Sequence, residues 1–176
     1  MDRQRGFTLA EAVFVTAIAA GLVTWGLPAF RDLHRNAART REVNQLVHAV
    51  HYARHEAIKR DGVVSLCPST DGAGCAPGGT PWHRGWIVFV NRDGDSPAVR
   101  DHGEDLLRAF PSWPAGTMIA NRGTLSFRPF GQTGVTATFP FCDERGSAPA
   151  GAVINRQTGR PRVSLLDPSS RPLTCD

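Results

Sequence analysis

The heptapeptide RGFTLAE at residues 5–11 opens an apolar stretch that continues to Phe30, and this stretch decides the fold of the chain. From Phe7 to Phe30 the only ionisable side chain is that of Glu11. A helix rises about 1.5 Å per residue, so this segment would reach about 36 Å, which is enough to cross a bilayer. Two arginines before the segment give a mild basic bias, which favours a cytoplasmic N-terminus.

Glu11 separates this segment from an ordinary secretory signal, whose apolar core has about 7 to 15 residues and avoids acids. A carboxylate inside a bilayer costs about 2.5 to 3.5 kcal/mol on the insertion scale, so it needs a partner of opposite charge. The alternative places Glu11 near the helix start with its carboxylate at the membrane interface. Both interpretations predict a transmembrane helix at residues 7–30.

The start of the chain resembles the class III signal of type IV pilins and type II secretion pseudopilins. Gly6 directly precedes Phe7, and Glu11 follows four places after Phe7. The resemblance implies that a prepilin peptidase cuts between Gly6 and Phe7 and that the new N-terminus is methylated. It also implies that Glu11 meets the N-terminal ammonium of a neighbouring subunit during assembly. Only an opposite charge makes a carboxylate tolerable in apolar surroundings, so this role agrees with the physics of the segment.

The rest of the chain has the size of one domain. Without the leader and the spanning segment about 145 residues remain, enough for one modest domain and not for two. The net charge is +4, and all basic residues except Lys59 are arginine. An excess of this size permits contact with polyanions without requiring it.

Four cysteines indicate two disulfides, because a domain that is exported enters an oxidising compartment. In the cytosol they would instead be metal ligands, but no C-x-x-C spacing is present, which disfavours zinc. Four cysteines allow three pairings. We choose Cys67 with Cys75, which clips a loop rich in Gly and Pro, and Cys142 with Cys175, which tethers the tail to the domain.

An amphipathic continuation of the helix is predicted at residues 31–61. Pro28 predicts a kink or local melting before it, and Asp61-Gly62 is typical of a helix C-terminus. One face should pack on the domain: Val43, Leu46, Val47, Val50, Ala53 and Ala57. The opposite face should be solvated: Gln45, Tyr52, Glu56 and Lys59.

Three histidines follow one edge of the same helix: His48, His51 and His55. His51 and His55 have the i, i+4 spacing of a metal pair, but no carboxylate lies between them where a metallopeptidase helix would need one. A solvated edge is therefore favoured over a metal site.

After Gly62 the period of the sequence changes to that of strands. Short segments of branched and aromatic residues alternate with Gly, Pro, Asp and Asn: 63–66, 86–90, 106–110, 125–127, 135–139 and 152–154. A final hairpin is predicted from residues 152–156 and 162–166, joined by residues 157–161. The fold class is therefore α+β.

Scattered residues of this domain resemble the FimT and GspH minor pilins, most closely the FimT-like ones: 53–60, Val64, 66–69, 85–89, 91–95 and 158–160. The resemblance implies a type IV pilin-like fold, with a long N-terminal helix packed on a C-terminal antiparallel β-rich domain. The implied organisation is a leader at 1–6, a transmembrane helix at 7–30, an amphipathic continuation at 31–61 and a periplasmic domain at 62–176.

Other chemistry is weakly indicated. Residues 91–95, with Asp101 and Glu104 beyond them, resemble half a calcium loop, but the first ligand is Asn and no acid falls at the twelfth place. Asp93-Gly94 as hairpin-turn chemistry is favoured. The Ser and Thr hydroxyls do not form, with His83 or His102, a sequence motif typical of a catalytic nucleophile and its base. We expect no catalysis, no metal and no cofactor.

The tail is basic. Between Arg145 and Arg171 the sequence has one acid, Asp167, and five arginines: Arg145, Arg156, Arg160, Arg162 and Arg171. If the stretch around Pro161 is extended, its two flanking arginines share a side and could address successive phosphates, which guanidinium groups bind bidentately. The alternative is a solvated hairpin with arginines placed for solubility.

The segment Gly159-Arg160-Pro161-Arg162 resembles a Gly-Arg-x-Arg motif of FimT-like minor pilins, in which it contacts DNA during natural transformation. The resemblance implies a minor pilin of the inner membrane, with a single pass and a periplasmic domain. Its partners would be other pilins, the prepilin peptidase and double-stranded DNA, bound without sequence specificity. The alternative is a structural minor pilin, or a minor pseudopilin of type II secretion, that binds no DNA.

Overall fold

The computed structural model of the chain describes residues 8–146, 150–154 and 157–175. In these residues one long helix, α1 (Leu9–Arg60), precedes strands that pair only in the antiparallel sense. This confirms the predicted α+β class. The chain forms two compact units that divide inside α1, the first ending at Ala38 and the second beginning at Arg39.

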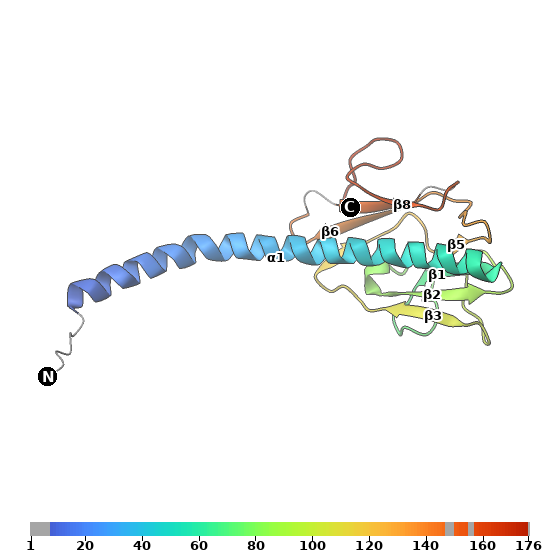
Figure 1. The fold of residues 1–176 in the computed structure, drawn as a ribbon, viewed down its shortest axis with the longest axis horizontal. Helices are drawn as coiled ribbons and strands as arrows, with labels where there is room; N and C mark the ends of the chain where they lie inside the picture. Colours follow the sequence, from blue (N-terminus) through green and yellow to red (C-terminus); the bar gives the residue numbers. More distant parts are fainter. Residues whose placement is uncertain (1–7, 147–149, 155–156, 176) are drawn as a thin grey trace. The chain divides into compact units, whose positions relative to one another are not determined.

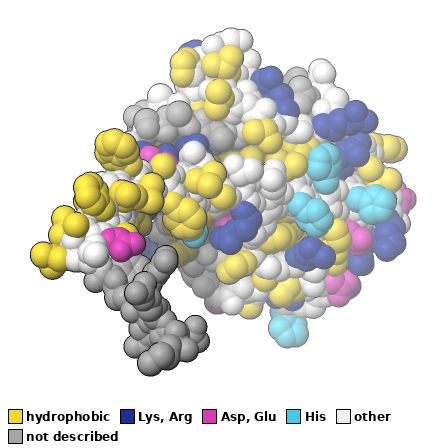
Figure 2. Space-filling model, turned by 60° about the vertical axis from the view of Figure 1, so that its left-hand side comes forward, with side chains coloured by type: hydrophobic (Ala, Val, Ile, Leu, Met, Phe, Trp, Pro, Cys, Tyr) yellow, Lys and Arg dark blue, Asp and Glu magenta, His cyan; other side chains and the backbone are white. Residues whose placement is uncertain are grey.

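The first unit is an apolar helix. Its large hydrophobic side chains are exposed, and Figure 2 shows them crowded along this part of the molecule. By length and composition the helix is long and apolar enough to cross a membrane. The helix runs through Pro28 without a break, so the expected local melting is not found there. Thr8 Oγ1 accepts the N–H of Glu11 at 3.3 Å and caps the helix.

The second unit packs the remaining part of α1 on two sheets (Figure 1). The first sheet has the order β3-β2-β1-β5 and the second the order β4-β6-β7-β8. The strands of the first are β1 (Val63–Pro68), β2 (Trp86–Asn91), β3 (Leu106–Phe110) and β5 (Leu125–Phe127). Those of the second are β4 (Gly116–Met118), β6 (Ala137–Asp143), β7 (Ala150–Ile154) and β8 (Pro161–Ser164). A short 3-10 helix, η1 (Trp82–Arg84), precedes β2.

One core joins the helix to both sheets. The predicted helix face is the buried one, and Ala49 joins it. Leu66 and Phe127 from the first sheet meet Phe139 and Ile154 from the second in this cluster. Burial of each such side chain is worth about 1.5 to 3 kcal/mol, so this cluster holds the two sheets and the helix together.

The opposite helix face differs from the prediction at Glu56. Its side chain is only 9% exposed, not solvated, because Arg60 and Lys59 on the next turn cover its carboxylate. Arg60 Nε donates to Glu56 Oε2 at 2.7 Å, and this bond is the first cause that lowers the pKa of Glu56. Tyr52, also predicted to be solvated, is half-buried, and the guanidinium of Arg108 lies 5.1 Å from its ring centre.

The predicted strands are present with shifts of a few residues, and the hairpin of β7 and β8 pairs Gly151 with Ser164 and Ile154 with Pro161. β4 is a strand that the sequence did not predict, because Gly116-Thr117-Met118 is too short to show alternation. β6 begins at Ala137 rather than Val135 and continues to Asp143. Its proline, Pro140, lies within the strand.

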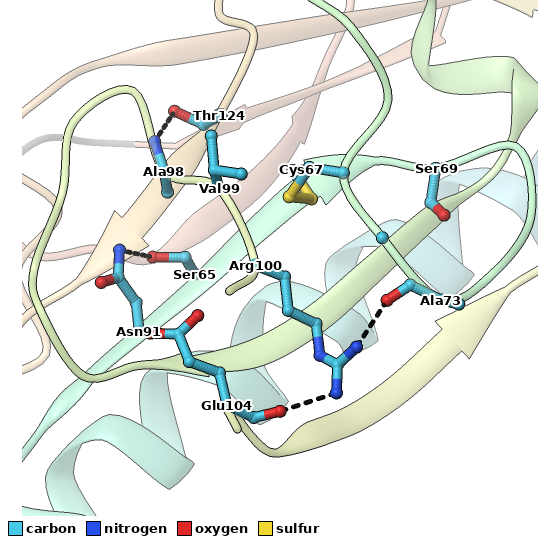
Figure 3. Close-up of a disulfide and its surroundings, with 12 residues drawn as sticks. Ser65, Cys67, Ser69, Ala73, Asn91, Ala98, Val99, Arg100, Glu104 and Thr124 are labelled. Atoms are coloured by element: carbon cyan, nitrogen blue, oxygen red, sulfur yellow. Dashed lines mark hydrogen bonds between the residues drawn. A yellow bond between two sulfur atoms is a disulfide. The ribbon is translucent and has the colours of Figure 1, made fainter. Parts of the chain in front are cut away.

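Disulfides join Cys67 to Cys75 and Cys142 to Cys175. The first closes the loop after β1 onto that strand, beside Ala98 of the connection between β2 and β3 (Figure 3). There the guanidinium of Arg100 donates to the carbonyl of Ala73 at 2.9 Å and to that of Glu104 at 2.7 Å. The second ties the end of the chain to β6.

The connection at residues 92–105 is longer than the tight hairpin that Asp93-Gly94 predicted. Asn91 explains its start, because the side chain is buried and hydrogen-bonded to the loop and to Ser65 of β1. Its Nδ2 donates to Asp95 Oδ1 at 2.9 Å, and its Oδ1 accepts the N–H of Gly94 at 2.7 Å. These bonds occupy the atom that a calcium loop would offer as its first ligand.

Candidate nucleic-acid interface

Arg54 of α1 joins the helix to two turns that are remote in sequence. Its Nε–H is shared between the carbonyl of Gly131 and the carbonyl of Thr158, each at 3.1 Å. The side chain is half-buried, so solvent competes weakly for these bonds. We call Arg54, Gly131, Thr158 and Gly159 the Arg54 clamp.

Both glycines of the clamp are required by the backbone. Gly131 has φ +74° and Gly159 has φ +61°, and residues other than glycine adopt these backbone angles only at a cost in free energy. A Cβ on Gly159 would lie 2.2 Å from the carbonyl oxygen of Gly131, which is backbone and cannot swing away. Gly159, predicted as part of a DNA motif, therefore fixes the turn that presents Arg160.

The two predicted arginines lie on the edge strand β8 and immediately before it. Arg160 and Arg162 are both exposed. Arg162 pairs with Val153, whereas Pro161 pairs with Ile154. Ile154 belongs to the main core and Val153 does not, so Arg162 lies on the sheet face directed away from that core.

Arg160 is directed differently. Its positive charge is one of the causes that lower the pKa of His51 on α1, after burial, Arg54 and His48. The guanidinium therefore lies within electrostatic reach of the helix. Arg160 lies in the turn before β8 that Gly159 fixes, and Arg162 lies within the strand. Figure 2 shows histidine side chains beside Lys and Arg side chains on this molecule.

Arg145 binds the buried carboxylate of Asp143. Its Nε donates to Asp143 Oδ1 at 3.1 Å, and the side chain of Asp143 is 4% exposed. Arg39 Nη1 lies 3.6 Å from the same carboxylate. The hydrogen bond from Arg145 is the first cause that lowers the pKa of Asp143. A guanidinium that neutralises a buried acid contributes little to an external positive field.

Arg171 is also paired, with Asp167 four residues before it. Its Nε donates to Asp167 Oδ2 at 2.9 Å, and its backbone N–H, the first cause of the lowered pKa of Asp167, donates to Oδ1. Arg156 lies outside the described residues. Within the described part of the chain, Arg160 and Arg162 are the tail arginines without a carboxylate partner.

The tail folds back over the second sheet. Leu173 N–H donates to the carbonyl of Leu165 at 3.0 Å, and Leu166 forms a bridge with Pro172. A Cβ on Gly151 would lie 2.3 Å from Leu173 Cδ1, so Leu173 packs directly on the β7 backbone. Together with the disulfide at Cys175, these contacts place the tail on the sheet.

The predicted processing residues Gly6 and Phe7 lie outside the described residues. Glu11 is exposed in the first turn of α1. Among residues 8–146, 150–154 and 157–175, no group of three or more His, Cys, Asp or Glu side chains could hold a metal ion. His51 and His55 are both exposed on α1.

The long N-terminal helix packed on antiparallel sheets defines a type IV pilin-like protein. Two crystal structures of the type IV minor pilin FimU from Pseudomonas aeruginosa strain PAO1 have this fold. The structure in space group P65 is 21% identical, covers 80% of this chain and 99% of FimU, and has a TM-score of 0.54. The structure in space group P21 is 19% identical, covers 83% and 98%, and has a TM-score of 0.56.

The chain belongs to the GspH family, whose description is Type II transport protein GspH and which matches residues 42–159. No match was found among curated proteins. The family and the fold together assign a minor pilin or pseudopilin of the GspH and FimT type, a class of structural proteins that assemble into filaments. The long apolar helix agrees with a membrane-anchored component.

The family match ends at Gly159, one residue before Arg160. The clamp lies inside the matched region, whereas both unpaired arginines lie beyond it. Arg54 was not singled out as a site residue from the sequence. The signal that could have found it is a single arginine on the edge of an otherwise apolar helix face, between Ala53 and Ala57.

Proposed function

We propose that this protein is a minor type IV pilin of the inner membrane that takes part in pilus assembly and binds double-stranded DNA during natural transformation. The observation that carries the proposal is the pair Arg160 and Arg162, exposed without carboxylate partners immediately before and within the edge strand β8. Guanidinium groups in this position can bind phosphates of one backbone. Duplex DNA offers the same phosphates whatever its bases, which suits uptake of arbitrary fragments.

The clamp supports the proposal because it makes the interface rigid. Arg54 and Gly159 hold the turn before β8, so little conformational entropy is lost when Arg160 meets a phosphate. We assign Gly159 and Arg54 to positioning and Arg160 and Arg162 to contact. Arg145 and Arg171 would add little, because each already neutralises an acid.

The test is a salt titration of DNA binding by the full chain in non-ionic detergent micelles. Replacing Arg160→Gln and Arg162→Gln should weaken duplex binding and reduce the salt slope by about two phosphate contacts. The matched control is Arg84→Gln with Arg108→Gln, which removes the same charge from exposed positions elsewhere that have no carboxylate partner among the described residues. If both double variants bind alike, net charge alone explains binding and the interface is wrong.

Membrane anchoring and processing are proposed together. A prepilin peptidase would cut between Gly6 and Phe7, and Glu11 would pair with the N-terminal ammonium of a neighbouring subunit, which relieves the cost of a carboxylate in apolar surroundings. Replacing Gly6 with Leu should leave an uncut precursor. A mature mass equal to that of the parent in this variant would contradict the proposal.

The second candidate function is a structural minor pilin, or a minor pseudopilin of type II secretion, without DNA binding. The family match favours it, since the family is described by type II transport and the match ends before Arg160. Neighbouring genes discriminate the two. Secretion components would favour the second candidate, and pilus-assembly or competence genes the first.

A further inference from the structure

One aromatic side chain stands out on the surface beside the proposed interface. Phe130 is 85% exposed, the most exposed large hydrophobic residue described in the second unit. It lies in the turn that follows β5 and immediately precedes Gly131 of the clamp. A single exposed ring is common on protein surfaces, so what it can bind depends on the groups around it.

The turn that carries Phe130 is rigid. Gly131 N–H donates to the carbonyl of Arg128 at 2.7 Å, and Arg128 N–H donates to the carbonyl of Gln132 at 2.9 Å. Arg54 fixes the same turn through the carbonyl of Gly131. A side chain on a turn that is held in this way can act as a preorganised surface, because little backbone entropy remains to be lost on binding.

The surroundings of the ring are positively charged. Gly159 approaches the carbonyl of Gly131 so closely that no Cβ fits between them, which brings the turn of Phe130 next to the turn of Arg160. Arg128 within the turn is exposed, and Arg54 lies behind it. Neither Arg128 nor Arg160 has a carboxylate partner among the residues that the structure describes.

We propose that Phe130 is a stacking platform for an unpaired nucleobase and that the arginines around it bind the phosphates of the same strand. Exposed aromatic rings among cationic side chains are the common means of binding single strands without sequence preference, since every base has a π-face. A duplex keeps its bases stacked inside and would meet only the arginines. The inference rests on the proposed function and refines its substrate to DNA with single-stranded ends or segments.

The experiment compares three probes with the full chain in non-ionic detergent micelles: a short oligothymidine, an abasic strand of equal length and a duplex. The parent should bind oligothymidine more tightly than the abasic strand, which has the same phosphates without bases. Phe130→Ala should weaken oligothymidine binding about tenfold and change duplex binding less than twofold. Phe130→Trp should keep or strengthen it, because the larger ring stacks at least as well.

Leu106→Ala is the control, since Leu106 is exposed on β3, at the opposite edge of the sheet from β5, and its loss should leave all three affinities unchanged. If the parent binds duplex but Phe130→Ala binds oligothymidine like the parent, the platform is wrong and the proposed function stands. If the parent binds no probe, both are wrong. If Phe130→Ala lowers filament incorporation while every DNA affinity is kept, Phe130 contacts another subunit and the platform is wrong.

Discussion

The tail of this protein holds two regions with the same residue type in opposite environments. Near Cys142, Arg145 is half-buried and bound to Asp143, which is almost fully buried. At the edge strand β8, Arg160 and Arg162 are exposed without a carboxylate partner among the described residues. The number of arginines in a stretch is therefore a poor measure of its binding charge. The acids that neutralise them decide how much of that charge faces outward.

The comparison predicts a separation of effects. A guanidinium that covers a buried carboxylate holds the fold, because removing it leaves a charge without a partner. Removing an exposed guanidinium changes the free energy of unfolding by less than about 0.5 kcal/mol, but it weakens the attraction of the surface for anions. Substitutions around Cys142 should therefore change the free energy of unfolding, and substitutions at β8 should change the affinity for DNA.

The largest expected effect follows from removing the disulfide that joins Cys142, beside the Arg145–Asp143 pair, to Cys175 at the end of the chain. Cys142 and Cys175 are 33 residues apart in sequence. Closing a loop of that length stabilises the fold by about 3 to 4 kcal/mol in the chain-entropy model. Cys142→Ser with Cys175→Ser should lose that amount, measured by urea unfolding of the full chain in micelles. A loss as small as that of a surface substitution would show that the tail is held without the disulfide.

The next effect concerns the clamp at the edge region. Gly159→Ala should cost about 2 to 3 kcal/mol, because the added Cβ meets a backbone oxygen in a left-handed conformation. Gly134→Ala is the matched control, since φ is +70° and nothing lies within 4 Å of its Cβ. The control should cost only about 1 kcal/mol, the conformational part alone. Equal losses in the two variants would contradict the close approach of the two clamp turns.

A smaller loss is expected for Arg145→Gln, about 1.5 kcal/mol, because Arg39 still faces Asp143. The pH dependence identifies the cause. The folded pKa of Asp143 lies below its ordinary value of 3.8, so its contribution is complete above pH 3.8 and is lost as the pH falls through the folded pKa. The variant should show a smaller loss of stability below about pH 4. If the free energy of unfolding of the variant fell as steeply below pH 4 as that of the parent, another group would be responsible for the stabilisation.

Local patterns predicted the elements well. The helix face around Leu46 and Val50 follows from periodicity, because exposure repeats along the helix. The strands at 106–110 and 125–127 follow from branched and aromatic residues between turn residues. The end of α1 was predicted at Asp61-Gly62, but the left-handed residue is Asp61, with φ +49°, and not the glycine. Gly62 N–H then reaches the carbonyl of Ala57 at 3.2 Å, as in a Schellman motif.

The site could be predicted only in part. Gly159, Arg160 and Arg162 could be singled out from the sequence because they lie in one short segment. The clamp joins residues 77 and 104 positions apart, and no local pattern connects Arg54 to Gly131 or Thr158. The burial of Asp143 beside Arg145 and Arg39 also depends on tertiary packing. Tail charge read from the sequence was therefore larger than the charge that the surface presents.

The smallest effect tests whether the two edge arginines lie on opposite faces of the sheet. The charge of Arg160 helps to lower the pKa of His51, because a nearby cation disfavours protonation of the imidazole. Arg160→Gln should therefore raise the pKa of His51, measured by NMR titration of the imidazole. Arg162→Gln should leave it unchanged, since Arg162 shares the sheet face of Val153, away from the core under α1. Equal increases in both variants would place the arginines on one side, and a single phosphate strand could then run along that face instead of across the edge.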